Sequence, residues 1–192
     1  MSRAQTESPV KRDGAALAMR ALAAGRFGRD GGGAEPKGGR ALVRPTRISG
    51  YASVFGAPDD ALDMVMRGAF RRSLAERGAQ GIRFLWQHDP ARPIGVWDSA
   101  REDAHGLYLS GRLVTDTRTG RDAAALVAAG ALDGLSIGFR TRSARRDPQS
   151  GLRRIFDIDL WEVSLVTFPL HPMARLDAGS TATGRAPGAL DS

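Results

Sequence analysis

The sequence predicts a mainly β domain with flanking helices, in which an antiparallel sheet is rolled up or closed into a barrel. Strand-like segments outnumber helical ones, and no regular alternation of strand and helix appears. Apolar residues also recur with a period of two in several segments. These three observations favour a rolled antiparallel sheet with helices packed outside it over a parallel α/β fold.

Seven segments carry the strand pattern. Residues 81–87 are typical, because Ile82, Phe84 and Trp86 fall on one face of a strand. Residues 103–106 predict a hairpin turn, and residues 147–151 predict a second turn. The predicted strands are residues 48–55, 81–87, 94–99, 107–113, 135–140, 152–159 and 161–168.

Two segments predict helices. Residues 69–77 place apolar side chains four residues apart, and residues 120–131 are rich in alanine. Asp116 or Thr117 can cap the second helix, because a short polar side chain there accepts a bond from a free backbone N–H.

Composition divides the chain of 192 residues into three parts. Residues 1–46 are rich in Gly, Ala and Arg, and we expect a flexible basic leader there. Residues 47–176 form the predicted core domain, and residues 177–192 form a flexible C-terminal tail. This core has the length of a single domain. The hydrophobic content of the whole sequence, 42%, is enough for a buried interior.

The basic charge belongs mainly to the leader. Residues 1–46 hold nine Lys or Arg and four Asp or Glu, which is +5 of the total net charge of +7. A basic arm can bind nucleic acid through its phosphates. Phe27 is the only aromatic residue in this segment, so base stacking has little support, and a solvated leader is the favoured interpretation.

Several functional classes receive no support from the sequence. The chain has no cysteine, which excludes disulfides, thiolate catalysis and cysteine-based zinc sites. Its histidines, His88, His105 and His171, are far apart in sequence, so we expect neither a metal site nor a cofactor. No apolar run reaches the roughly 20 residues of a membrane span, and we expect no signal peptide and no membrane partner.

A serine between two glycines is the most informative local feature. Gly134, Ser136 and Gly138 match the G-x-S-x-G pattern of the α/β-hydrolases, but a strand-rich chain of this length does not suit that parallel-sheet fold. Gly138 shares a strand face with Ser136, which would let a substrate backbone approach closely. Taken alone, the motif also fits a serine on the solvent face of an edge strand.

A histidine and a carboxylate complete the set that acyl transfer needs. His88 lies 48 residues before Ser136 at the end of a predicted strand, where it is a candidate general base. Glu162 lies 26 residues after Ser136 in an apolar strand, where an uncompensated carboxylate is costly. Each also has a simpler interpretation, as a turn histidine and an exposed glutamate. Ser164 is a lesser alternative nucleophile.

The motifs taken together, in order, resemble the HK97-type prohead maturation proteases of tailed phages and phage-like particles. The resemblance covers about residues 47–176. Its motifs are Gly50-Tyr51-Ala52-Ser53-Val54-Phe55, Arg67-Gly68-Ala69-Phe70, Leu85-Trp86-Gln87-His88-Asp89, Pro93-Ile94-Gly95, Leu132-Asp133-Gly134-Leu135-Ser136-Ile137-Gly138-Phe139 and Trp161-Glu162-Val163-Ser164-Leu165-Val166-Thr167-Phe168-Pro169.

The resemblance implies a β-barrel wrapped by helices, similar to the herpesvirus assemblin protease. It implies a serine endopeptidase located inside the immature capsid, or prohead, in the bacterial cytoplasm. The substrate would be the scaffolding segment of the major capsid protein or a separate scaffold, and then the protease itself. A homo-oligomer inside the prohead stays open as a further partner.

The family pattern also implies the site residues. Its catalytic histidine corresponds to His88 and its serine to Ser136, and its third member corresponds to Glu162. The segment after Phe168 departs from the expected pattern, because it carries His171 where a small residue and asparagine would be expected. His171 is therefore an alternative third member.

A non-enzymatic capsid assembly or scaffold protein with the same fold is the main alternative function. The joint presence of His88, Ser136 and Glu162 argues against it, because a protein without turnover would be free to lose them. The Gly- and Ala-rich ends add a further hypothesis, that the enzyme trims its own tails during maturation.

Overall fold

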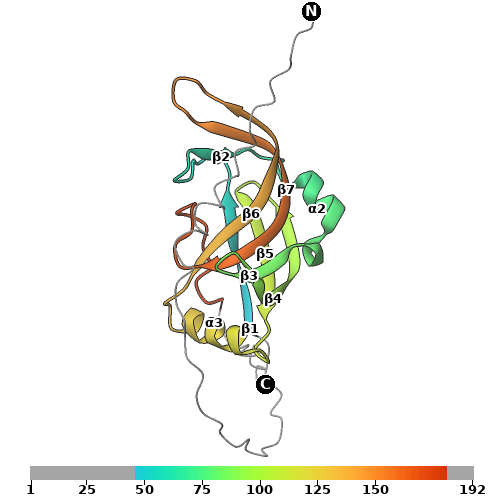
Figure 1. The fold of residues 1–192 in the computed structure, drawn as a ribbon, viewed down its shortest axis with the longest axis vertical. Helices are drawn as coiled ribbons and strands as arrows, with labels where there is room; N and C mark the ends of the chain where they lie inside the picture. Colours follow the sequence, from blue (N-terminus) through green and yellow to red (C-terminus); the bar gives the residue numbers. More distant parts are fainter. Residues whose placement is uncertain (1–45, 181–192) are drawn as a thin grey trace, which may run out of the picture.

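The computed structural model describes residues 46–180, and the rest of the predicted leader and tail lies outside the described residues. The fold is mainly β with helices on its outside, which confirms the predicted class (Figure 1). Its elements are, in order, β1 (Thr46–Val54), β2 (Asp63–Val65), α2 (Arg71–Arg77), η1 (Ala79–Gly81), β3 (Arg83–Trp86), β4 (Asp89–Glu102), β5 (Gly106–Leu113), α3 (Arg118–Ala128), β6 (Gly134–Arg146) and β7 (Arg153–Val166).

One curled sheet contains all the strands, in the order β1-β5-β4-β3-β7-β2, with β6 on the other edge of β7. Most neighbours are antiparallel, but β2 and β3 both run parallel to β7. The parallel pairs arise because α2 carries the chain across between β2 and β3, so that both strands run in the same direction along β7. The predicted antiparallel sheet is therefore a mixed one at this point.

Along this edge, the long strand β7 bonds to three segments, namely β2, the start of α2 and β3. Residues 153–155 pair with β2, and residues 162–165 pair with β3. Between them, the N–H of Ile158 donates to the carbonyl of Ala69, and the N–H of Leu160 donates to Ser73 Oγ on α2. The start of α2 and the residues just before it thus fill the gap between β2 and β3, and they accept hydrogen bonds from these two donors of β7.

The segment after β7 closes the curl of the sheet. Its backbone bonds on one side to β6, where the N–H of Leu135 donates to the carbonyl of Ala174. On the other side, the N–H of Tyr51 in β1 donates to the carbonyl of Arg175. The segment therefore bridges the two edge strands, β1 and β6. Asp177, the first residue of the predicted tail, also bonds to Ser49 and Tyr108.

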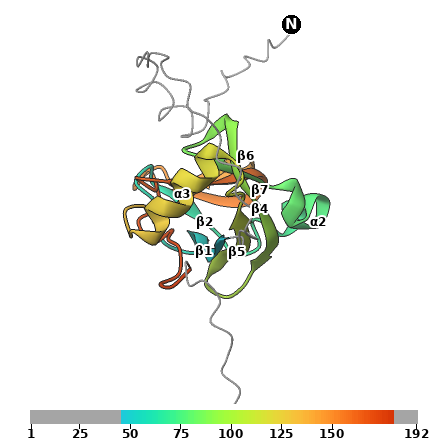
Figure 2. The same ribbon diagram turned by 90° about the horizontal axis from the view of Figure 1, so that it is seen from below.

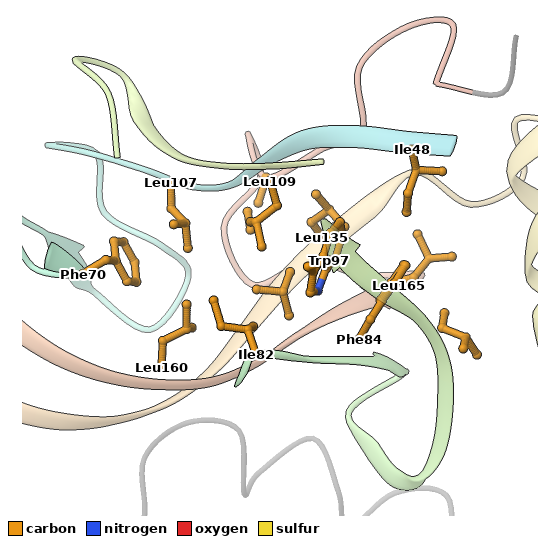
Figure 3. Close-up of a cluster of buried hydrophobic side chains, with 14 of the residues drawn as sticks. Ile48, Phe70, Ile82, Phe84, Trp97, Leu107, Leu109, Leu135, Leu160 and Leu165 are labelled. Carbon is orange, nitrogen blue, oxygen red and sulfur yellow. The ribbon is translucent and has the colours of Figure 1, made fainter. Parts of the chain in front are cut away.

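A single hydrophobic core fills the curl, as Figure 3 shows. Phe84 and Trp97 stack within this core, with ring centroids 4.2 Å apart. The helix α2 lies against the outside of the sheet beside β7, and α3 lies at a different side of the molecule (Figures 1 and 2). Of the two residues predicted to cap α3, Thr117 is the one that does so. Its side-chain oxygen accepts a hydrogen bond from the N–H of Gly120.

Three differences from the predicted strands matter for the site. Strand β2 was not predicted, since three residues are too short to show a period. Strand β4 begins at Asp89 rather than residue 94, so it forms a tight hairpin with β3. The two strands predicted at 152–159 and 161–168 are one strand, β7, which contains a bulge.

No helix among residues 46–180 is long and apolar enough to cross a membrane.

Candidate active site

The structure brings Ser136, His88 and Glu162 together, although they come from three different parts of the chain. His88 Nε2 lies 2.9 Å from Ser136 Oγ, and His88 Nδ1 lies 2.5 Å from Glu162 Oε1. Ser136 is on β6, Glu162 is on β7, and His88 is in the turn between β3 and β4. The side chains of His88 and Glu162 are only 15% and 12% exposed, so water screens this chain of contacts weakly.

The hydrogen bonds define how the protons are arranged. An ionised carboxylate can only accept, so His88 Nδ1 carries the proton that it donates to Glu162. In the neutral imidazole, Nε2 is then the acceptor, and the hydroxyl of Ser136 donates to it. This tautomer is the one in which the imidazole can take the serine proton during attack on a carbonyl.

A strained two-residue turn holds His88 in place. Gln87 and His88 have φ angles of 53° and 59°, the left-handed region that a type I′ hairpin turn requires at both positions. Residues other than Gly, Asn and Asp seldom adopt this conformation, because it costs each such residue about 1–2 kcal/mol. The sequence predicted only a strand end here, because Gln-His carries none of the usual signals for such a turn.

Contacts with β7 stabilise the strained turn. The N–H of Gln87 donates to the carbonyl of Leu165, and the N–H of His88 donates to Ser164 Oγ at 3.1 Å. The Gln87 side chain bonds to Thr167 through both its oxygen and its nitrogen. Backbone strain that the surroundings hold in this way is common at functional sites.

A β-bulge places Glu162 on the same side as Ser136. Phe139 pairs with Leu160 and Gly138 pairs with Glu162, so Trp161 is the extra residue in β7. Leu160 faces the core before the bulge and Val163 faces it after the bulge. The phase of the strand therefore changes at Trp161, and regular alternation from Leu160 would instead have turned Glu162 toward the core.

Gly138 provides the space that the carboxylate occupies. It lies directly opposite Glu162, and a Cβ atom at this position would overlap the Glu162 carboxylate. The sequence suggested that this small residue admits the substrate backbone. In the structure the space is filled by Glu162 itself, which is how the carboxylate reaches His88.

Ser164 takes part in the site as a partner of the other residues. Its side chain is fully buried, its hydroxyl donates to Glu162 Oε2 at 2.6 Å, and its oxygen accepts from the N–H of His88. Both carboxylate oxygens of Glu162 are thereby bonded. As the alternative nucleophile, Ser164 is poorly placed, because its burial leaves a substrate carbonyl no approach. A supporting role for it was not predicted, and only its shared strand face with Glu162 could have indicated one.

His171 lies apart from the His88–Glu162 pair. It lines a pocket that reaches Ser136, but its Nδ1 atom accepts from the N–H of Met173 and makes no contact with His88. His105 is at the tip of the β4–β5 hairpin, where its ring packs edge-on against Tyr51. Within residues 46–180, no group of three or more His, Asp or Glu side chains is arranged to hold a metal ion.

Sequence comparison identifies the family. A sequence model described as caudovirus prohead serine protease matches residues 41–185, which is most of the chain. The chain belongs to this family. The match includes the strands and the turn that carry Ser136, His88 and Glu162.

Individual relatives agree with this family. The chain is 34% identical over 141 residues to the prohead protease of Enterobacteria phage HK97, covering 71% of this chain and 61% of that protein. It is 28% identical over 141 residues to the prohead protease of Escherichia phage T5, covering 72% of this chain and 65% of that protein. It is also 30% identical over 138 residues to a capsid polyprotein of Pseudomonas phage PAJU2, covering 67% of this chain and 19% of that protein. The matched part thus spans less than two thirds of each relative.

The solved structure of a phage protease has a related fold at low sequence identity. The capsid assembly protease of bacteriophage T4 superposes with a TM-score of 0.50 at 15% identity, covering 62% of this chain and 81% of that chain. The KSHV protease gives a TM-score of 0.45 at 12% identity over 69% of this chain and 64% of that chain. The curled sheet with outer helices therefore occurs in a phage capsid protease.

Proposed function

We propose that this protein is a serine endopeptidase that matures phage-type capsids. It cleaves the scaffolding segment of the major capsid protein inside the prohead, in the cytoplasm of the bacterial host. The family match and the relatives named as prohead proteases support this activity. The relative within a capsid polyprotein supports a capsid protein as the substrate.

In the proposed mechanism, Ser136 is the nucleophile and His88 is the general base. Ser136 Oγ attacks the scissile carbonyl carbon, and His88 Nε2 takes the hydroxyl proton. The imidazolium then gives this proton to the leaving amine, which leaves an acyl-enzyme at Ser136. Water, activated by His88 in the same way, releases the acyl group and regenerates the serine.

Glu162 positions the imidazole in this mechanism. Its carboxylate holds the proton of His88 on Nδ1 and stabilises the positive charge that develops on the ring. Ser164 acts one step further out, since its hydroxyl bonds to the other oxygen of Glu162. Backbone N–H groups would stabilise the oxyanion, where losing one donor typically costs about 10²–10³ in rate.

The continuous chain of contacts from Ser136 through His88 to Glu162 is the observation that carries the proposal. The test is to co-express the full chain with its cognate major capsid protein and to read intact masses. We expect a shortened capsid protein with the wild type and a full-length one with Ser136→Ala. The substitution removes one oxygen from a small side chain, so the fold should persist.

Ser143→Ala is a matched control, because Ser143 lies exposed on the same strand, β6. This variant should process the capsid protein as the wild type does. Full-length capsid protein with both wild type and Ser136→Ala, in assembled particles, would favour the non-enzymatic scaffold alternative. Processing by the Ser136→Ala variant would exclude Ser136 as the nucleophile.

A further inference from the structure

The turn that carries His88 is supported by β7 more than by its own partner strand, β4. Across the turn Trp86 pairs with Asp89, but the next pair involves Pro93, so residues 90–92 of β4 have no partner on β3. These three residues are exposed. The turn is also strained, because both of its central residues have a left-handed backbone. Contacts with β7 and with the residue that follows it therefore decide where the imidazole lies.

The side chain of Gln87 continues the bonding between β3 and β7 where the backbone pairing ends. The last pair of the two strands joins Trp86 to Leu165. Beyond it, the N–H of Thr167 donates to Gln87 Oε1 at 3.3 Å, and Gln87 Nε2 donates to Thr167 Oγ1 at 2.9 Å. A backbone N–H can only donate, so the amide oxygen must face it, which fixes the orientation of the amide. The amide thus takes the place of a further peptide group of β3.

These two bonds differ from the other contacts of the turn because they can be removed without touching the catalytic groups. The N–H of His88 donates to Ser164 Oγ, but Ser164 also bonds to Glu162, so a change there would disturb the carboxylate directly. The bond from the N–H of Gln87 to the carbonyl of Leu165 involves the backbone alone. The Gln87 amide is therefore a side chain that holds the turn against the end of β7 and does nothing else in the site.

We infer that Gln87 is a positioning residue of the proposed endopeptidase. Its amide clamps the turn to Thr167 and so keeps the imidazole of His88 between Ser136 and Glu162. Both polar contacts of the imidazole are to strands other than its own, so a small shift of the turn disturbs both of them. A misplacement of about 1 Å can cost about 10² in rate. The inference rests on the proposed function, and it adds a residue that acts through His88 rather than on the substrate.

Gln87→Asn separates the clamp from the backbone of the turn. Asparagine adopts the left-handed conformation more readily than glutamine and is favoured in type I′ turns, so the turn itself should be at least as stable. Its side chain is one methylene shorter and cannot reach both groups of Thr167. The full-length variant should therefore keep its melting temperature or raise it, while His88 loses its alignment with Ser136.

The rate at which a fluorophosphonate modifies Ser136 measures this alignment, because the serine reacts only when His88 activates it. This probe does not require a known cleavage site. We expect Gln87→Asn to react about 10- to 100-fold more slowly than the wild type. The same substitution at Gln149, which is exposed in the turn between β6 and β7, is the matched control and should react within about twofold of the wild type.

Thr167 tests the other half of the clamp. Thr167→Val keeps the shape of the side chain and the backbone N–H but removes the acceptor for Gln87 Nε2, and it should slow the reaction about tenfold. Thr167→Ser keeps a hydroxyl and should react several-fold faster than Thr167→Val. In the Gln87→Asn background, Thr167→Val should cost little more, because the two side chains act through the same contact.

The proton between His88 Nδ1 and Glu162 Oε1 gives a second readout. These atoms lie 2.5 Å apart, so the proton should have a far-downfield resonance, recorded in the Ser136→Ala protein to avoid self-cleavage. Adding Gln87→Asn should shift or broaden this signal, and adding Gln149→Asn should leave it unchanged. A residue that only stabilised the fold would lower the melting temperature without moving the signal.

The outcomes separate this inference from the proposed function. Labelling of Ser136 as fast in Gln87→Asn as in Gln149→Asn would overturn the inference and leave the endopeptidase intact. Equal rates in Thr167→Val and Thr167→Ser would also overturn it, as would a loss of rate accompanied by a large fall in melting temperature. A wild type that neither reacts at Ser136 nor cleaves the capsid protein would contradict the proposed function itself, and the positioning role would fall with it.

Discussion

Glu162 shows at the scale of single residues how this site is built. A partly buried carboxylate needs partners, and it has one for each oxygen, His88 Nδ1 and Ser164 Oγ. The sequence contained the reason to suspect it, since an acidic residue in an apolar strand is costly. It placed Ser164 on the same strand face as Glu162, but it could not show the hydrogen bond between them, because that contact depends on the local twist and pairing of β7.

Replacing Glu162 by glutamine should reduce catalysis strongly without unfolding the protein. The amide is the same size, but its nitrogen can donate to His88 Nδ1 and shift the ring proton to Nε2, the wrong tautomer. We expect the rate of cleavage to fall by about 10³–10⁴. Peptide cleavage and thermal melting would be measured together.

Glu76→Gln is the matched control, because Glu76 is an exposed glutamate that pairs with Arg72 on α2. It should cleave within about twofold of the wild type. A Glu162→Gln enzyme as active as this control would show that Glu162 does not orient His88.

Adding one methyl group at Gly138 should displace the carboxylate. The new Cβ would overlap Glu162, which must then move away from His88. A displacement of this kind typically costs about 10² in rate. Glu162→Asp shortens the acid and should lose less activity in the Gly138→Ala background than in the wild type, because the two positions are coupled. Strictly additive losses in this double-mutant cycle would mean that Gly138 does not act through Glu162.

At the scale of elements, the bulge and the turn explain what could not be read from the sequence. Regular alternation predicted the strands that carry Ser136 and Glu162. The same pattern predicted two strands, which meet near Leu160, where the structure has the single strand β7. The reason is that the bulge at Trp161 changes the phase of the strand. The Gln87–His88 turn was missed because its left-handed backbone depends on bonds to β7 that are formed only in the folded protein.

An ionic contact joins α2 to the sheet near the bulge. Asp159 on β7 pairs with Arg77 at the end of α2 and with Arg142 on β6. The pKa of the Asp159 carboxyl lies below its ordinary value of 3.8. The larger cause is a hydrogen bond from the Trp161 indole, and the next is the hydrogen bond from Arg77. A lowered pKa stabilises the fold at pH values above 3.8, and this stabilisation is lost as the pH falls further.

The Asp159→Asn variant should therefore be less stable than the wild type at pH 6, by a small amount typical of a partly exposed pair. The difference in melting temperature should shrink as the pH is lowered from 5 to 3, because the wild-type carboxyl becomes protonated. Asp122→Asn, at an exposed position on α3, is a control for the change of charge. A difference that stays constant or grows on acidification would contradict the assigned sign.

At the scale of the whole molecule, the sheet curls until its edge strands are joined by the segment after β7. The sequence predicted the class and the rolled shape, because strand-like segments outnumber helical ones and show no regular alternation of strand and helix. It could not predict the bridge between β1 and β6, since residues 174–177 have no strand pattern and pair only through isolated backbone bonds. The division into leader, core and tail stays a prediction for residues 1–45 and 181–192.

The ends of the chain carry a prediction of their own. Gly- and Ala-rich segments at the termini are easily cut by proteases, and an endopeptidase would find them on its own chain. On prolonged incubation at high concentration, the wild type should lose residues from one or both ends, and Ser136→Ala should stay intact. Intact-mass measurement decides between the two results, and equal full-length masses for both proteins would contradict self-trimming.

The most direct test of the proposed mechanism is to label the active enzyme with a fluorophosphonate and to map the modified residue. We predict one adduct, on Ser136, that forms in step with the loss of cleavage and that His88→Ala prevents at neutral pH. An adduct on Ser164 or another serine that accompanies the loss of activity would contradict the assignment of the nucleophile. So would full modification of Ser136 with cleavage unchanged.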